Sequence, residues 1–236
     1  MKPPNSHKSA KMPFIGVKEL DKMALNLLED YMPQFLVIPM VFDIDKLINE
    51  VLCLPVYESE MYIKHIMGII SYVTMRFPIN KKNFIELEAG SILINELLHD
   101  NIIETRFTKA HEVAHWLIFQ KFKSRMNEPY ACCKELLSRS EFWDIDRIEQ
   151  LNKMYPDAFL EVQADILANM LLMPTRTFIP LAQQLMNEHG FFNHRMIAGT
   201  RIEQQNKVIN ELATIYNVPI ESVRMHLRCC DMYGNR

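Results

Sequence analysis

The chain has 236 residues, with 26 Lys and Arg against 29 Asp and Glu, a formal net charge of −3, and 49% hydrophobic residues. That composition is typical of a globular protein and excludes a largely disordered chain. Because acidic residues slightly outnumber basic ones, the chain as a whole has no excess of positive charge for binding nucleic acid. No apolar run approaches the roughly 18 residues of a membrane helix.

The first fourteen residues and the cysteines favour a cytoplasmic protein. Residues 1–14 are polar, basic and proline-containing, and they lack the apolar stretch of a secretory signal. The five cysteines are an odd number, and four of them form two adjacent pairs, Cys132 with Cys133 and Cys229 with Cys230. Such a set is a poor disulfide framework, as expected for a reducing compartment.

Two helices are predicted before the first strand. Apolar residues recur at helical spacing from Leu20 to Tyr31, which predicts a one-sided amphipathic helix. We assign residues 1–36 to an N-terminal tail and this helix. A second helix is expected to begin after Asp43 as its cap and to end before Pro55.

Short segments rich in branched and aromatic residues follow, and they predict the strands of one small sheet. They cover residues 66–77, FIELE from Phe84, and SILIN from Ser91. Helical periodicity then returns. Because strands and helices do not alternate, the fold class is α+β. The helices that we expect cover residues 101–122, 158–173, 175–188, 201–216 and 220–229.

The helix expected from Asn101 carries His111, Glu112 and His115 in an HExxH pattern. At about 100° and 1.5 Å per residue, two histidines four positions apart share one side of a helix, and both imidazoles reach the same metal ion. Glu112 points to the side of this pair, where it can take a proton from water held on the metal. The pattern therefore predicts metal-assisted hydrolysis.

The two histidines also fall on the apolar side of that helix. The stripe predicts a buried face, and buried imidazoles need hydrogen-bond partners or a metal ion. Core histidines with ordinary hydrogen bonds are the structural alternative. The stripe consists of Phe107, Ala110, His111, Ala114, His115 and Ile118.

A catalytic zinc site uses three protein ligands, so a carboxylate is expected elsewhere in the chain. The candidate is Glu161, near the start of a helix with Asp157 as its expected cap. Asp165 lies four residues later on the same face, where it can accept the free N–H of a ligating histidine. Ala164 and Ala168 would let this helix approach the first one closely. The alternative for Glu161 is a solvated first-turn glutamate favoured by the helix dipole.

Two strings, RFTKAHEVAHWLIF over 106–119 and EVQADILANMLLMP over 161–174, resemble the ImmA/IrrE family of zinc metallopeptidases. The resemblance extends more weakly over residues 40–228. It implies a zincin-like α+β fold, in which a small sheet packs on the HExxH helix and a helical C-terminal part follows. The implied activity is limited cleavage of a helix-turn-helix repressor or antitoxin in bacteria or mobile elements. The implied residues are three zinc ligands, His111, His115 and Glu161, a general base, Glu112, and a carboxylate behind the ligands, Asp165.

The segment between the two motifs is longer than the family pattern. We treat residues 122–156 as an insertion in a metallopeptidase domain of residues 37–190. The insertion includes Cys132 and Cys133. One hypothesis is that a thiolate from either cysteine occupies the open zinc position and keeps the enzyme latent. The alternative is that both are small buried apolar residues.

In the mechanism expected from these residues, zinc lowers the pKa of a bound water, and Glu112 deprotonates that water as it attacks a peptide carbonyl. The protonated Glu112 then serves the leaving amine. An extended substrate would pair with the SILIN strand from Ser91 if that strand lies at a sheet edge, and an interior strand is the equal alternative. The sequence does not identify an oxyanion donor. The candidates by chemistry are Tyr130, Tyr155, His189 and His194.

Residues 210–227, NELATIYNVPIESVRMHL, have the residue pattern of a helix-turn-helix. They lie within a helical C-terminal part that we assign to residues 191–236. Its second helix would carry Arg224, His226 and Arg228, but the surrounding chain offers little charge for phosphates. We therefore expect two packed helices rather than direct nucleic-acid binding. A third alternative is a non-catalytic zinc protein, or an interaction protein whose site is blocked by the insertion.

Overall fold

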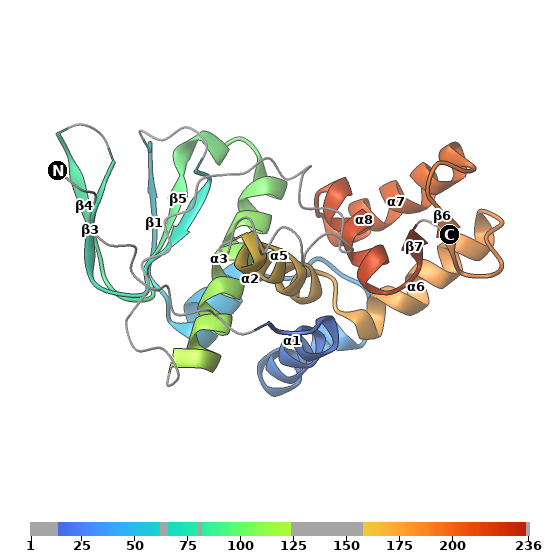
Figure 1. Cartoon of the computed structure of the whole chain (residues 1–236), viewed down its shortest axis with the longest axis horizontal. Helices are drawn as coiled ribbons and strands as arrows, with labels where there is room; N and C mark the ends of the chain where they lie inside the picture. Colours follow the sequence, from blue (N-terminus) through green and yellow to red (C-terminus); the bar gives the residue numbers. More distant parts are fainter. Residues whose placement is uncertain (1–13, 62–65, 80–81, 124–157, 235–236) are drawn as a thin grey trace, which may run out of the picture.

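The computed structural model describes residues 14–61, 66–79, 82–123 and 158–234. The protein is of the α+β class, as the sequence predicted. In Figure 1 a hairpin and a small sheet lie at one end, the helices α3 and α5 lie in the middle, and the C-terminal helices form the other end. The first helix, α1 (Val17–Tyr31), packs against α5.

Two helical segments precede the sheet where the sequence predicted them. The second begins after Asp43, whose Oδ1 accepts a hydrogen bond from the backbone N–H of Lys46 at 2.9 Å. This N-cap satisfies a backbone donor that the first helical turn leaves free. The segment ends before Pro55, as expected. The bounds are η1 (Pro33–Leu36), α2 (Ile44–Lys46) and its π-helical continuation η2 (Leu47–Leu52).

The strands that precede α3 form two separate sheets, so the prediction of one small sheet there is wrong. Three strands lie in the order β1, β5, β2, with β1 parallel and β2 antiparallel to β5. β3 and β4 form an antiparallel hairpin of their own. The predicted strand over residues 66–77 is two strands, because the chain leaves one sheet after Ile70 and enters the other at Met75. The bounds are β1 (Val56–Ser59), β2 (Gly68–Ile70), β3 (Met75–Pro78), β4 (Phe84–Leu87) and β5 (Ile92–Asn95).

The SILIN segment forms the interior strand of the larger sheet. All four residues of β5 are buried, and β1 and β2 flank the strand on its two sides. The alternative that SILIN is a free edge for substrate is therefore wrong, and the interior alternative is correct. The edges of this sheet belong to β1 and β2.

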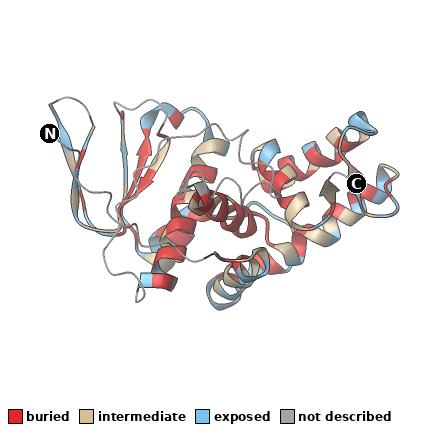
Figure 2. Ribbon diagram, in the orientation of Figure 1, coloured by how far each residue is buried: buried red, intermediate tan, exposed pale blue. Residues whose placement is uncertain are grey.

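Apolar layers cover both faces of the larger sheet. Ile70 and Ile94 belong to the main core, which the helices share. Ile69 and Leu93 belong to a smaller core together with Phe77 of the hairpin. Because successive side chains of a strand point to opposite faces, the sheet separates the helices from the hairpin. Figure 2 shows that buried residues concentrate on the central helices.

The helices after the sheet have bounds within one residue of those predicted. Asn101 caps α3, since its Oδ1 accepts a hydrogen bond from the backbone N–H of Glu104 at 3.2 Å. Asp157, the expected cap of α5, lies outside the described residues. None of the helices within the described ranges has the length and hydropathy needed to cross a membrane. The bounds are η3 (Glu96–Leu98), α3 (Ile102–Phe122), α5 (Ala158–Leu172), α6 (Thr175–Glu188), α7 (Ile202–Tyr216) and α8 (Ile220–Cys229), with a small parallel pair, β6 (Met196–Ile197) and β7 (Tyr233–Gly234).

Candidate metal centre

Small residues allow α3 and α5, which pack against each other, to lie close together. Ala110 and Ala114 of α3 and Ala164 and Ala168 of α5 are all 0% exposed. The distance between packed helices depends on the side chains at their contact, so alanines favour a close approach. Longer side chains that emerge beside these alanines can therefore meet across the two helices.

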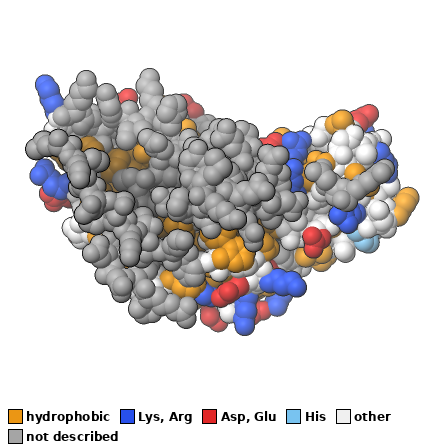
Figure 3. All heavy atoms as spheres, in the orientation of Figure 1, with side chains coloured by type: hydrophobic (Ala, Val, Ile, Leu, Met, Phe, Trp, Pro, Cys, Tyr) orange, Lys and Arg blue, Asp and Glu red, His pale blue; other side chains and the backbone are white. Residues whose placement is uncertain are grey.

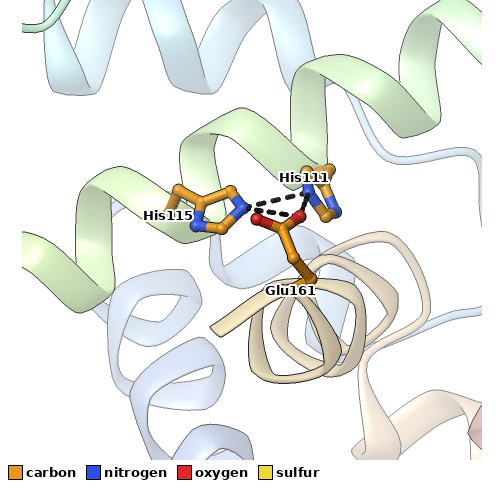
Figure 4. A group of neighbouring side chains, drawn as sticks. All are labelled: His111, His115 and Glu161. Carbon is orange, nitrogen blue, oxygen red and sulfur yellow. Dashed lines mark hydrogen bonds and ion pairs between the residues drawn. The ribbon is translucent and has the colours of Figure 1, made fainter. Parts of the chain in front are cut away.

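Three polar side chains converge between α3 and α5 (Figure 4). The Nε2 atoms of His111 and His115 lie 3.0 Å apart. The Oε2 atom of Glu161 lies 3.0 Å from Nε2 of His111 and 3.2 Å from Nε2 of His115. His115 and Glu161 are buried, and His111 is partly buried. These are the three residues that the sequence predicted as ligands, and their donor atoms lie close enough together to hold a metal ion.

Asp165 contacts His111 on the side away from the other two residues. Its Oδ1 atom lies 2.7 Å from Nδ1 of His111. In a neutral imidazole this contact favours a proton on Nδ1, which leaves the lone pair of Nε2 directed toward Glu161 and His115. The predicted contact of Asp165 with a histidine is thus present, and it orients the ring.

Burial and charged neighbours shift the pKa values of His111 and Glu161 in opposite directions. Burial lowers the pKa of His111, but the carboxylates of Asp165 and Glu161 outweigh burial and raise that pKa to about 10. Burial raises the pKa of Glu161, but His115 and His111 outweigh it and hold that pKa well below its usual range. Without a metal ion, His111 therefore carries a proton at neutral pH, and an arriving cation has to displace it.

Metal binding should accordingly strengthen as the pH rises. Because the pKa of His111 is raised to about 10, the apparent zinc affinity should increase about tenfold per pH unit between about pH 6 and pH 8. Competition with a chromophoric zinc chelator measures this slope. In Asp165→Asn, which loses the largest charge that raises this pKa, the increase should level off at a lower pH. Equal affinities at the two ends of the range would contradict the expected proton release.

Glu112 lies between the two histidines along α3 but is turned toward the sheet. It is 6% exposed, and its Oε1 atom adjoins Gly68 of β2. The residue that the sequence predicted as the general base is therefore not one of the three converging side chains. It is buried beside them, where α3 meets the strand.

Several other predicted site residues do not contribute to this group. Tyr130, Cys132, Cys133 and Tyr155 lie outside the described residues. Two further candidates for the oxyanion donor lie at and after the C-terminal end of α6, away from α3 in Figure 1. There His189 pairs with Glu211 at 2.8 Å, and His194 contacts Asn187 at 3.1 Å.

Three hydrogen bonds that hold α3 and α5 in place were not predicted from the sequence. The guanidinium group of Arg106 donates to the backbone carbonyls of Asn217 and Phe42, the latter at 2.7 Å. On α5, Oε1 of Gln163 accepts a hydrogen bond from the backbone N–H of Ile15 at 2.7 Å. Each contact joins residues that are more than 60 positions apart, so no local pattern could have revealed them.

The second helix of the helix-turn-helix-like segment is packed into the protein. Arg224 pairs with Glu221 at 2.6 Å, whereas a helix that reads DNA presents an exposed basic face. This arrangement gives DNA binding no specific support. The buried residues of α8 are Ser222, Val223, Met225, His226 and Leu227.

Comparison with known proteins assigns no relative to the chain. No family model, no curated protein and no solved structure matches it. The proposed function therefore depends on the two motif-bearing helices and on the geometry between them.

Proposed function

We propose that the protein is a zinc-dependent endopeptidase with a zincin-like fold that makes a limited cut in a protein substrate. The observation that carries this proposal is the meeting of His111, His115 and Glu161 between α3 and α5, with Asp165 behind His111. Two histidines one turn apart on a helix, joined by a carboxylate from another helix, are a ligand set used by catalytic zinc sites.

The distances support zinc as the ion. Zinc binds imidazole nitrogen and carboxylate oxygen at about 2.0–2.1 Å in tetrahedral geometry, which separates neighbouring ligand atoms by about 3.3 Å. The three donor atoms lie 3.0, 3.0 and 3.2 Å apart, so a small outward movement admits the ion. Three protein ligands also leave a fourth position open for water or substrate.

Each polar residue of the site then has a role in hydrolysis. When bound, zinc supplies a Lewis acid and lowers the pKa of its water. Glu112 would accept a proton from the water that attacks the peptide carbonyl and would pass it to the leaving amine. Asp165 keeps the ring of His111 in the orientation that ligation needs.

The edge of β2 that faces away from β5 supports binding of an extended polypeptide. Among the described strands β2 pairs only with β5, so its other edge carries no strand. Gly68 of this strand adjoins the carboxylate of Glu112. A peptide that adds to this edge through backbone hydrogen bonds would pass beside the general base.

The class of substrate comes from the resemblance to the ImmA/IrrE family. The motif strings over 106–119 and 161–174 support a cytoplasmic repressor or antitoxin with a helix-turn-helix as the substrate. The experiment is to incubate the zinc-loaded protein with repressors encoded beside its gene and to measure intact masses. We expect one or two defined fragments, which chelation should abolish. Stoichiometric zinc without cleavage of any such repressor would instead favour the non-catalytic zinc protein.

Asp165→Asn should weaken zinc binding without abolishing it. Loss of a partner behind a ligating histidine typically lowers metal affinity by about 10–100-fold, and the 2.7 Å contact to Nδ1 of His111 makes Asp165 such a partner. Asp30→Asn, at an exposed position of α1, is the matched control and should bind zinc as the wild type does. An unchanged affinity in Asp165→Asn would remove the orienting role.

A further inference from the structure

Gly68 lacks a side chain at a point where the larger sheet faces α3. It lies in β2 opposite Ile94 of β5. Ile70, two residues later and on the same face, is 1% exposed and belongs to the main core. Position 68 therefore lies where a strand normally places an apolar side chain against the helix layer.

Two side chains of α3 occupy that space instead. A Cβ atom at position 68 would lie 2.6 Å from Cγ2 of Thr108, 2.8 Å from Oε1 of Glu112 and 3.1 Å from Cγ of Glu112. Favourable contacts between carbon atoms are about 3.5–4.0 Å long, so even an added methyl group would force these groups to move. Thr108 and Glu112 are 4% and 6% exposed, so both are confined.

The backbone conformation of Gly68 does not require glycine. Gly90, Gly190 and Gly199 have φ angles of 91°, 84° and 77°, a region that disfavours other residues. Gly68 is not among the glycines with positive φ. Glycine at position 68 is therefore explained by space, and part of that space holds the carboxylate on which the proposed hydrolysis depends.

The peptide groups of Gly68 also point to the edge of the sheet that no described strand occupies. The carbonyl of Met67 accepts from the N–H of Asn95, and the N–H of Ser71 donates to the carbonyl of Ser91, both at 2.9 Å. In an antiparallel pair, alternate residues direct their backbone groups to the neighbouring strand. Since Met67 and Ser71 face β5, Gly68 faces away from it. The Glu112 carboxylate thus lies next to the edge where a peptide would pair.

The geometry points to Gly68 as a positioning residue, which by lacking a side chain gives the Glu112 carboxylate its place between α3 and the edge of β2 that faces away from β5. This inference rests on the proposed function, in which Glu112 is the general base. Proton transfer needs heavy atoms within about 2.6–3.2 Å, and a displacement of about 1 Å can lower a rate by about 10²-fold. A side chain at position 68 should therefore slow the chemical step without contacting the zinc ligands.

The test compares Gly68→Ala with Gly234→Ala in the zinc-loaded full chain. A Cβ atom at position 234 would meet no atom within 4 Å, so this variant controls for an added methyl group. With fluorescein-labelled casein as the substrate, Gly68→Ala should lower kcat by about 10²-fold, with KM and zinc stoichiometry unchanged. Gly234→Ala should match the wild type. A wild-type kcat in Gly68→Ala would overturn the inference.

Adding Thr108→Ser to Gly68→Ala separates positioning from packing. This second substitution removes the Cγ2 atom that the new Cβ would meet at 2.6 Å, and it leaves the contact with Glu112 in place. Gly68→Ala alone should lower the melting temperature. In the double variant the melting temperature should recover toward that of the wild type, while kcat should stay low. Recovery of kcat together with the melting temperature would show that Gly68 serves only packing against Thr108.

A second double variant tests the contact without relying on activity. Glu112→Asp withdraws the carboxylate by one methylene, so Gly68→Ala should lower the melting temperature less in that background than in the wild type. Equal shifts in the two backgrounds would overturn the inference, whether or not casein is cleaved. If zinc-loaded wild type leaves casein and repressors intact while the shifts differ, the proposed function fails, and the contact between Gly68 and Glu112 stands.

Discussion

Glu112→Gln should abolish peptide cleavage while the protein keeps its zinc. Glutamine fills nearly the same buried space beside β2, but its amide cannot take a proton from water. General acid–base catalysis contributes about 10²–10⁴-fold to a rate, so the turnover of labelled casein should fall by at least that lower figure. Metal analysis of the same sample should give the zinc content of the wild type.

An exposed glutamate provides the control for this substitution. The side chain of Glu203 on α7 is 78% exposed, and Glu203→Gln should leave both turnover and zinc content unchanged. Retained turnover in Glu112→Gln would dismiss Glu112 as the base. Loss of zinc from that variant would instead assign Glu112 to the metal ligands.

Glu161→Gln should lose tight zinc binding. The substitution replaces a charged ligand oxygen, 3.0 and 3.2 Å from the two imidazole nitrogens, with a neutral amide. Loss of a residue behind a ligand lowers affinity by about 10–100-fold, so the loss of a ligand itself should exceed that range. Chelator competition measures the affinity, and circular dichroism checks that the helices are retained.

The control and the companion variant sharpen this prediction. Glu188→Gln, at an exposed position of α6, should bind zinc with the wild-type affinity. His115→Ala should lose binding as Glu161→Gln does, because each variant leaves two protein ligands. If Glu161→Gln retained the wild-type affinity, its carboxylate would not be the third ligand.

The helices and the pairing of His111 with His115 could be predicted because local rules determine them. The side chain of Asn101 caps α3, and the second helical segment ends before Pro55. On α3, residues four positions apart share a side by helix geometry alone, which brings His111 and His115 together. The meeting with Glu161 on α5 needed one more signal, and the motif string over 161–174 supplied it.

The arrangement of the sheets and the surroundings of the base could not be predicted from local patterns. Branched and aromatic residues run through 66–77 without a marked break, so the sequence does not show that the chain changes sheets between Ile70 and Met75. The strand β1 contains the exposed residues Tyr57 and Glu58 and lacks the apolar alternation by which strands are found. The approach of Gly68 to α3 is a tertiary contact that the chain pattern does not encode.

The most direct test of the central claim is X-ray absorption at the zinc edge on protein reconstituted with zinc. The account predicts one zinc per chain with nitrogen and oxygen neighbours at about 2.0–2.1 Å, including the scattering of two imidazoles from His111 and His115. Failure to take up stoichiometric zinc, or a first shell with fewer than two imidazoles, would contradict it.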